Sequence, residues 1–318
     1  MKRLLAPLPI LLLLCGAASA QNYPSRPVRM IAPYASGGSS SAGAQALSQK
    51  FQELVGQPLI VDYRPGAASN IGSDMVAKAA PDGYTVLMGT TSLAINPSLY
   101  RVMPFNPLKD LVPVAILFRA PNVLAVNPTL PIRSVKELLD HARANPGKLN
   151  YASSGTGATN HMAMELLKHL AGLDIVHVPF QGSGETLPAL IGNQVQVMFS
   201  PASSLKAAAA AGRIRLLGVS GARRDEALNL APIAASGLPG FESDVWFGLF
   251  VPAGTATALV TKLNADINRV LADRQVREVL TNAGQEVGGG TPEDMRRLLA
   301  TDAERWATVV KATGIKAD

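Results

Sequence analysis

The chain has 318 residues, of which 47% are hydrophobic and 16% charged, and its formal net charge is +6 at pH 7. This length suits two α/β domains of ordinary size. The densest basic spots, Arg223-Arg224 and Arg296-Arg297, have no interleaved aromatic residues, which argues against a nucleic-acid partner.

The first twenty residues predict a secretory signal peptide. Lys2 and Arg3 are basic, an apolar run continues through Leu14, and small residues at 18–20 favour cleavage after Ala20. The apolar run is too short to span a bilayer. Cys15, the single cysteine, also admits a lipoprotein interpretation, although Leu14 stands where a small residue is expected. After cleavage no disulfide can form, so we expect a bacterial periplasmic protein that relies on its core.

Short β-like runs alternate with amphipathic helical segments along most of the chain. The predicted strands are Val28–Ala32, Leu59–Tyr63, Thr85–Gly89, Val114–Phe118, Val123–Asn127, Asn150–Ala152, Ile175–Pro179, Gln196–Phe199, Leu216–Ser220 and Trp246–Val251. The predicted helices are Ala42–Leu54, Ile71–Lys78, Val135–Ala144, His161–Leu170, Thr186–Gly192, Leu205–Gly212, Ala256–Asp273, Gln275–Ala283 and Pro292–Thr313. This alternation predicts an α/β fold with mainly parallel sheets covered by helices. Thr291 is expected to cap the helix that Pro292 starts.

Proline-rich stretches mark two places where the chain is expected to pass between lobes. The first runs from Pro121 to Pro131, and the second is the Pro- and Gly-rich stretch from Pro232 to Gly240. We therefore expect lobe one to comprise residues 21–121 plus 246–318, and lobe two residues 122–245.

Two loops of small residues follow predicted strands. Gly37-Gly38 allows close backbone approach, and Ser39–Ser41 adds donors and caps at the start of a helix. A similar loop, Tyr151–Gly157, precedes a helix in the other predicted lobe. Either loop alone is often an ordinary helix-capping turn. Because both stand at strand-to-helix junctions, where anions bind and open α/β sheets hold ligands, the pair favours a carboxylate receptor.

Further neutral donors follow other predicted strands, and such donors can hold a carboxylate without a buried counter-ion. They are Thr90-Thr91-Ser92, Gln181-Gly182-Ser183-Gly184 and Ser200. Tyr34 and Phe180 lie at predicted loop edges and could line a cleft.

Catalytic and cofactor motifs are weak. Ser154 and His161 have no evident carboxylate partner in the sequence, and Asn160 occupies the third glycine position of a dinucleotide-binding pattern. The four histidines lack a compact metal-binding spacing. We expect no catalysis, no cofactor and no metal, with a serine hydrolase built on Ser154 and His161 as an unfavoured alternative.

A series of short motifs runs along the chain after the signal peptide. They are Tyr23–Val28, Pro33–Gly38, Gly56–Pro58, Arg64–Gly66, Asn70–Gly72, Ala80–Thr85, Asn96-Pro97, Asn145–Gly155, His177–Pro179, Gly237–Phe241, Trp246–Gly248 and Pro252–Thr255. In this order the series resembles the Bug-type receptors, the substrate-binding proteins of tripartite tricarboxylate transporters.

The resemblance implies a type II-like periplasmic-binding-protein fold with two lobes, two crossovers and a ligand cleft between the lobes. It also implies that loops of both lobes hold one carboxylate, partly through water. The residues carried over by motif are Tyr34, Ser36, Gly38, Ser39, Ser40, Ser41 and Thr90 in lobe one, and Ser153, Ser154, Thr156, His161, Phe180, Gln181, Gly182 and Ser183 in lobe two. Ser92 and Ser200 join them from the hydroxyl clusters.

The chain departs from the family pattern at two positions. Ser41 and Ser200 stand where many members have aspartate. Losing two carboxylates disfavours a contact with a ligand amino group, so we hypothesise a ligand with several carboxylates or an uncharged tail.

These features predict a monomeric extracytoplasmic receptor that binds a small organic acid and delivers it to membrane permease subunits. A periplasmic sensor that reports a metabolite to a membrane kinase would use the same site and stays open. The sequence names neither the ligand nor the cognate permease.

Overall fold

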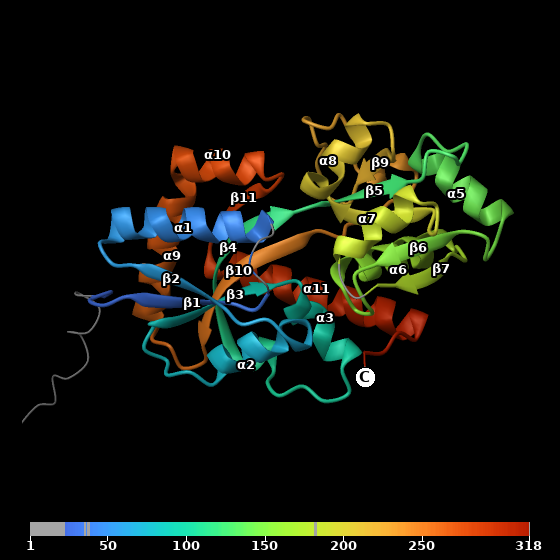
Figure 1. Ribbon diagram of the computed structural model, residues 1–318. Helices are drawn as coiled ribbons and strands as arrows, with labels where there is room; N and C mark the ends of the chain where they lie inside the picture. The colour runs from blue at the N-terminus through green and yellow to red at the C-terminus, as the bar shows by residue number, and fades with distance from the viewer. Residues whose placement is uncertain (1–22, 35, 37–38, 181–182, 318) are drawn as a thin grey trace, which may run out of the picture.

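The computed structural model describes residues 23–34, 36, 39–180 and 183–317. The predicted signal peptide lies outside these residues. Two sheets, each covered by helices on both faces, lie side by side along the long axis of the molecule (Figure 1). Among the described residues, no helix is both long and apolar enough to cross a membrane.

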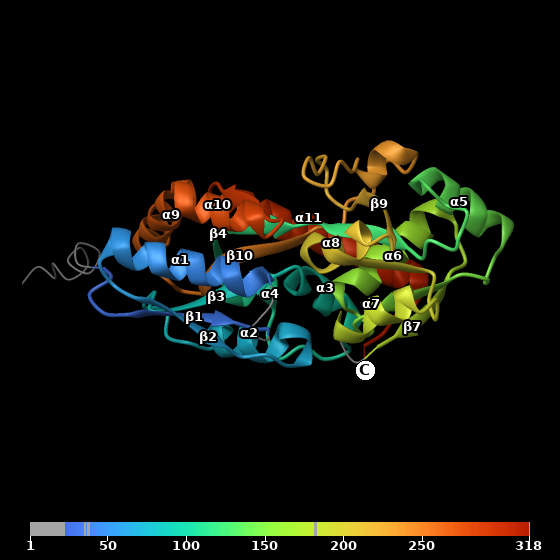
Figure 2. The same cartoon turned by 45° about the horizontal axis from the view of Figure 1, so that its top comes forward.

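The first sheet has six strands. Their order is β11 (Glu286–Gly289), β4 (Leu111–Ala120), β10 (Val245–Pro252), β3 (Thr85–Thr90), β1 (Val28–Ala32) and β2 (Leu59–Tyr63). One face packs against α1 (Ser39–Val55), α9 (Thr257–Ala272) and α10 (Arg274–Asn282). The other face packs against α2 (Asn70–Ala77), α3 (Ser92–Leu99) and α11 (Pro292–Thr313). Figure 2 shows α1, α9 and α10 together on one side of the strands and α2 on the other. The short helix α4 (Pro107–Asp110) leads into β4.

The second sheet has five strands. Their order is β7 (Val176–Pro179), β6 (Asn150–Ser153), β8 (Val197–Pro201), β5 (Asn122–Val126) and β9 (Arg215–Val219). Helices α5 (Val135–Ala144) and α6 (Thr159–Ala171) cover one face. Helices α7 (Ser183–Ile191) and α8 (Ala202–Ala210) cover the other. Short 3-10 helices at Ala67–Ser69 and Ile233–Ser236 complete the set.

Each sheet carries an antiparallel strand at the corresponding place, β10 between β3 and β4 and β5 between β8 and β9. Each of these strands follows a passage of the chain from the other sheet. A strand that enters from the opposite sheet starts at the edge where the parallel strands end, so it must run against them. The expectation of mainly parallel sheets was therefore wrong, and the sheets are mixed. Strand β11, which also pairs antiparallel, was not predicted because Glu286-Val287-Gly288-Gly289 lacks an apolar run.

Most other predicted elements are confirmed to within a few residues. The helices Val135–Ala144 and Pro292–Thr313 have the predicted bounds. The expected cap at Thr291 is confirmed as a capping box: its Oγ1 accepts from Asp294 N at 3.1 Å, and the Asp294 carboxylate accepts from Thr291 N at 2.9 Å. Helix α3 was not predicted, and it contains Pro97, a residue that is disfavoured inside helices.

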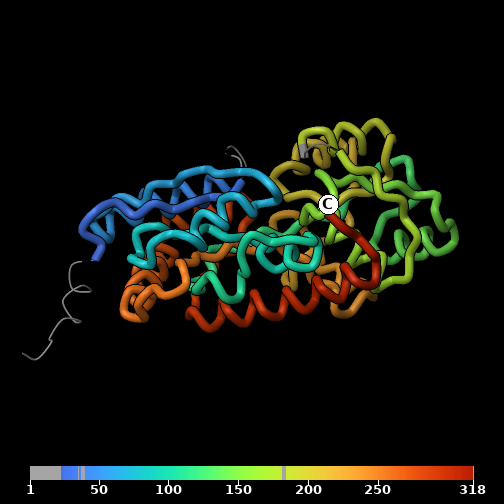
Figure 3. Tube along the Cα trace, turned by 90° about the horizontal axis from the view of Figure 1, so that it is seen from below, coloured from blue at the N-terminus to red at the C-terminus, as the bar shows by residue number. Residues whose placement is uncertain are grey.

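The largest apolar core spans both sheets on the side of α11 and α6, where Trp246, Trp306 and Tyr151 are buried. Figure 3 shows α11 running along this side from the first sheet to the second, with the C-terminus at the far end. The two halves are thus joined by packing as well as by the chain.

The stretch from Pro232 to Gly240 does not form the second passage between the sheets. Ile233 and Leu238 are buried in the core of the second half, and Phe241 stacks on Phe199 with ring centroids 5.9 Å apart. The chain passes back at residues 243–245, where Ser243 N donates to the carbonyl of Ser220 at 3.0 Å. The apolar residues between the prolines and glycines fold this stretch onto the second sheet.

Candidate functional site

Strand directions bring the predicted loops of the two halves to facing edges. In the first sheet β1, β3 and β4 run the same way, and β4 leads directly into β5 of the second sheet. In the second sheet β5 runs against β8, with Asn122 opposite Pro201, and β6 and β7 run with β8. The carboxyl ends of all these parallel strands therefore face the first crossing, from opposite sides. Figure 1 shows the N-terminal end of α1 turned toward the second half.

The first loop contributes an aromatic wall and a helix start. Tyr34 is half-buried; its hydroxyl donates to Met88 Sδ at 2.8 Å, and its ring lies 5.7 Å from Phe247 in an edge-to-face contact. Burial raises the pKa of Tyr34 well above its usual value, so the phenol stays protonated. Ser36 is exposed, whereas Ser40 is half-buried and Ser41 buried in the first turn of α1. Ser39 and Ser183 are the first residues of α1 and α7. The expected contacts Gly38, Gln181 and Gly182 lie outside the described residues.

Thr90 and Ser92 form a linked pair where β3 ends. Their hydroxyl oxygens are 2.6 Å apart, and Ser92 N donates to Thr90 Oγ1 at 3.3 Å. The Ser92 hydroxyl also donates to Ser69 Oγ at 3.4 Å. Thr90 is 7% exposed. These linked hydroxyls lie at the edge that faces the second half.

A strained segment beside this pair was not predicted. Ala67, Ala68 and Ser69 all have positive φ, at 46°, 47° and 78°, which side chains rarely adopt. The carbonyl of Ala68 accepts from Asn96 Nδ2 at 2.8 Å, and the same amide donates to Asn70 Oδ1 at 2.8 Å. Three consecutive strained residues cost of the order of 1–3 kcal/mol each. Asn96 thus holds Ser69 in place against the Ser92 hydroxyl.

In the second half, the loop after β6 is organised by its own side chains. Ser153 Oγ lies 2.6 Å from His177 Nε2 and accepts from Gly155 N at 3.2 Å. The Ser154 hydroxyl donates to Asn160 Oδ1 at 3.1 Å. Thr156 is exposed at the tip of the loop. Ser153 therefore shapes the loop from inside, whereas Ser154 and Thr156 lie on its accessible side.

His161 is held as a neutral ring. Its Nδ1 accepts from Gly157 N at 3.0 Å, so the ring proton lies on Nε2. The ring stacks on His177 at a centroid distance of 4.0 Å and is 2% exposed. Burial first, and then the nearby His177 and Lys168, lower the pKa of His161 to about 3. His161 can donate one hydrogen bond but carries no positive charge at neutral pH.

Phe180 and Ser200 complete the edge of the second sheet. Phe180 is half-buried, and its backbone N donates to the carbonyl of Ser153 at 3.0 Å. Ser200 is 5% exposed and lies opposite Val123 in the register of β8 and β5, directly beside the first crossing.

The loop after β6 lies directly against the first half. Gly157 has φ +81°, and a Cβ at this position would stand 2.9 Å from Leu99 Cδ1 of α3. The carbonyl of Leu99 accepts from Ala317 N at 3.2 Å. The loop after β6 thus contacts the first half at the last residue of α3.

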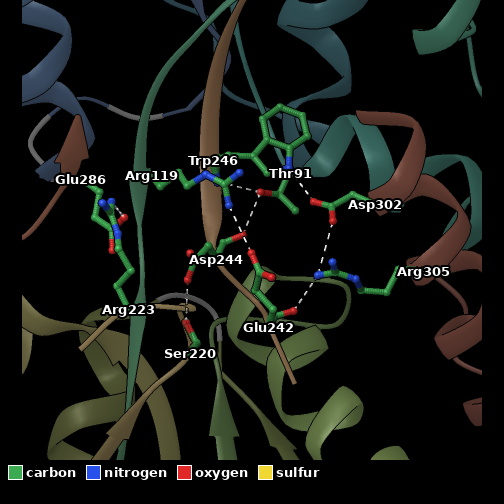
Figure 4. Close-up of polar contacts among 10 residues, drawn as sticks. All are labelled: Thr91, Arg119, Ser220, Arg223, Glu242, Asp244, Trp246, Glu286, Asp302 and Arg305. Carbon is green, nitrogen blue, oxygen red and sulfur yellow. Dashed lines mark hydrogen bonds and ion pairs between the residues drawn. The ribbon is translucent and has the colours of Figure 1, made fainter. Parts of the chain in front are cut away.

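A buried polar cluster ties the two crossings to β3 (Figure 4). The Ser220 hydroxyl donates to Asp244 Oδ1 at 3.3 Å and accepts from Asn122 N at 2.8 Å, so it touches both crossings. Thr91 Oγ1 donates to the carbonyl of Asp244 at 3.3 Å and accepts from Trp246 N at 3.0 Å. Sequence reasoning grouped Thr91 with the ligand donors, but its hydroxyl instead fixes the second crossing to the end of β3.

A second set of contacts ties the crossings to α11. Trp246 Nε1 donates to Asp302 Oδ2 at 2.6 Å, and Arg305 lies 3.4 Å from the same carboxylate. Arg305 also donates to the carbonyl of Glu242 at 2.8 Å, and the Glu242 carboxylate pairs with Arg119 at 3.2 Å. Figure 4 shows these side chains converging on the second crossing.

Residues 44–315 match the model of the tripartite tricarboxylate transporter family receptor, TctC. The chain belongs to this family. It is 35% identical to Protein BugT of Bordetella pertussis over 322 residues, which covers 99% of each chain. The resemblance to Bug-type receptors is therefore confirmed.

Solved structures confirm the expected fold. The structure described as R. palustris Rpa4515 with adipate is similar at a TM-score of 0.80 and 36% identity, covering 92% of this chain and 99% of that one. The periplasmic binding protein BugD is similar at a TM-score of 0.78 and 28% identity, covering 93% and 100%. The chain thus has the two-sheet fold of periplasmic solute-binding proteins and is a solute-binding receptor of the TctC family.

Proposed function

We propose that this receptor is exported to the periplasm, binds a small carboxylate between its two lobes, and delivers it to the permease subunits of a tripartite tricarboxylate-type transporter. We assign lobe one to residues 21–121 plus 246–318 and lobe two to residues 122–245. The protein acts as a monomer and catalyses no reaction.

The facing strand ends are the observation that carries this proposal. They place hydroxyls and the starts of α1, α3 and α6 on both sides of the first crossing. Helix starts expose unpaired backbone N–H groups and favour negative charge. None of the expected contact residues is a lysine or arginine, and His161 is neutral. A carboxylate can be held there by neutral donors, without the desolvation of a buried cation. The related R. palustris structure with adipate supports a carboxylate as the ligand class.

The hydrolase alternative finds no support in the hydrogen bonds of the second loop. The Ser154 hydroxyl donates to Asn160 Oδ1, and the Nδ1 of His161 is occupied by the Gly157 N–H. A serine nucleophile needs a base within hydrogen-bond reach of its hydroxyl. The sensor alternative uses the same site as transport, and a pull-down that recovers either permease subunits or a membrane kinase distinguishes the two.

The test is a calorimetric and thermal-shift screen of the exported chain, from residue 21 onward, against mono-, di- and tricarboxylates, amino acids and neutral amides. The variants Thr90→Val and Ser154→Ala each remove one hydroxyl from a facing edge. Each should weaken binding roughly 10- to 100-fold, the usual effect of losing a hydrogen bond to a charged group. Thr301→Val, the same change on an exposed position of α11, is the control. Wild-type affinities retained by both variants, or binding by amino acids alone, would contradict the proposed site.

A further inference from the structure

The turn between β2 and α2 lies at the strand ends of the proposed carboxylate site, although its residues were not among the expected contacts. On one side, a Cβ on Gly72, in the first turn of α2, would stand 2.8 Å from the Cβ of Pro33, which directly follows β1. On the other side, Ser69 Oγ accepts from the hydroxyl of Ser92, two residues after the end of β3, at 3.4 Å. The turn therefore lies between the ends of β1 and β3, at the edge that faces the second half.

The hydrogen bonds among three hydroxyls at this edge run in one direction. The single hydrogen of the Ser92 hydroxyl is donated to Ser69 Oγ, so in the 2.6 Å pair Thr90 is the donor and Ser92 the acceptor. Thr90 Oγ1 in turn accepts from Ser92 N at 3.3 Å. The chain thus runs from Thr90 through Ser92 to Ser69, and only the hydrogen of the Ser69 hydroxyl is not used within it.

The Ser69 side chain does not stabilise its own turn by capping. Ser69 occupies the N-cap position of α2, yet within the described part of the chain its side chain makes no capping hydrogen bond. Its φ of +78° suits glycine better than serine. The residue is half-buried, at the same edge as the hydroxyls of β3. A serine at a strained position without a capping bond indicates a use for its hydroxyl outside the turn.

Asn96 fixes the turn that carries this hydroxyl. Asn96 is 1% exposed, and its Nδ2 donates to the carbonyl of Ala68 and to Asn70 Oδ1, each at 2.8 Å. These bonds hold the residues on either side of Ser69. Asn96 lies four residues after Ser92 in α3, so both are on one face of that helix. One face of α3 therefore holds both the backbone and the hydroxyl of Ser69.

We propose that Ser69 is a ligand-binding residue of lobe one, whose hydroxyl donates to the bound carboxylate, and that Asn96 is its positioning residue. The inference rests on the proposed function and names a further donor of the same site. Hydrogen bonds in a chain polarise one another, so the last hydroxyl is strengthened as a donor by the two before it. The effect expected for Thr90→Val is then transmitted to the carboxylate through this chain.

The test is isothermal titration calorimetry of the exported chain, from residue 21 onward, with acetate, succinate, adipate and citrate, together with thermal unfolding of the ligand-free proteins. Ser69→Gly removes the hydroxyl and places glycine at a φ that glycine readily adopts. For the acid that binds the wild type most tightly, the affinity should fall roughly 10- to 100-fold. The thermal midpoint should stay the same or rise. A purely structural residue would not combine weaker binding with unimpaired stability.

Ala67→Gly is the matched control. Ala67 is exposed and has a φ of +46°, so this variant relieves similar strain in the same turn but removes no donor, and it should keep the wild-type affinity. Asn96→Leu removes both donors to the turn and should weaken binding by no more than Ser69→Gly does. In a Ser69→Gly background it should weaken binding no further, because it acts through Ser69.

Two results would overturn the inference and leave the proposed function intact. One is wild-type affinity in Ser69→Gly, and the other is an equal loss of affinity in Ser69→Gly and Ala67→Gly. If the wild-type protein binds none of the four acids, both the inference and the proposed function are wrong.

Discussion

The buried carboxylate of Asp244, in the second crossing, should make stability depend on pH. It is 8% exposed, its nearest described donor is the Ser220 hydroxyl, and the charges of Glu242 and Glu286 lie near it. Burial first, and then the charges of these two acids, raise the pKa of Asp244 to about 7 against the smaller opposing effects of Arg119 and the Ser220 hydrogen bond. Asp244→Asn keeps the shape of the side chain and an acceptor for Ser220 but removes the charge.

The direction of this pH dependence follows from the folded-state and reference pKa values of Asp244. The folded-state pKa of about 7 lies above the reference of 3.8, so the folded protein binds this proton more tightly. This contribution to stability is complete below about pH 4 and is lost as the pH rises through 7. The full shift corresponds to roughly 4 kcal/mol, and the steepest slope to about 1.4 kcal/mol per pH unit. At pH 8 we expect Asp244→Asn to be roughly 2 kcal/mol more stable than the wild type, after the cost of an unpaired amide NH₂.

Urea unfolding between about pH 4.5 and pH 8 gives the free energy of unfolding of both proteins at each pH. Burial also raises the pKa of Asp302, but both proteins retain that group, so the difference between the two curves isolates Asp244. Asp174→Asn, the same change on an exposed residue, controls for net charge. Parallel curves for Asp244→Asn and the wild type would refute the reasoning.

Three further outcomes are expected. Gly157→Ala should destabilise the protein by roughly 2–3 kcal/mol, because position 157 combines a φ of +81° with a close contact to Leu99. Gly172→Ala, with φ +62° and open space around it, should cost about 1 kcal/mol. Equal losses in the free energy of unfolding, measured in urea, would show that the contact between Gly157 and Leu99 is unimportant. Thr291→Ala should destabilise the protein by about 1 kcal/mol, because it removes the capping box of α11. Thr301→Ala, on the exposed face of the same helix, should cost much less. Similar thermal midpoints for the two variants would argue against a stabilising cap. Small-angle X-ray scattering should show compaction when a bound carboxylate saturates the protein, and unchanged profiles would count against lobe closure.

Much of the local structure could be predicted from the sequence, and the errors have physical causes. Apolar periodicity located the strands Val28–Ala32 and Leu59–Tyr63 with their observed bounds. Periodicity reports burial along one strand but not the direction of its neighbour, so the antiparallel placement of β5 and β10 was missed. The prediction for the stretch from Pro232 to Gly240 was based on its prolines and glycines, whereas the buried side chains of Ile233 and Leu238 decide where it packs.

In the candidate site, too, local features could be predicted from the sequence and long-range contacts could not. The hydroxyl-rich loops and the helix starts that follow them are local features, so the sequence determined them, together with the family. The partner of each side chain depends on residues far away in the chain. Ser153 is engaged by His177, Thr91 by the second crossing, and Ser69 by Ser92. The tertiary structure alone decided these pairings and the raised pKa of Asp244, because hydrogen bonds and desolvation act over a few ångströms of space, whatever the distance along the chain.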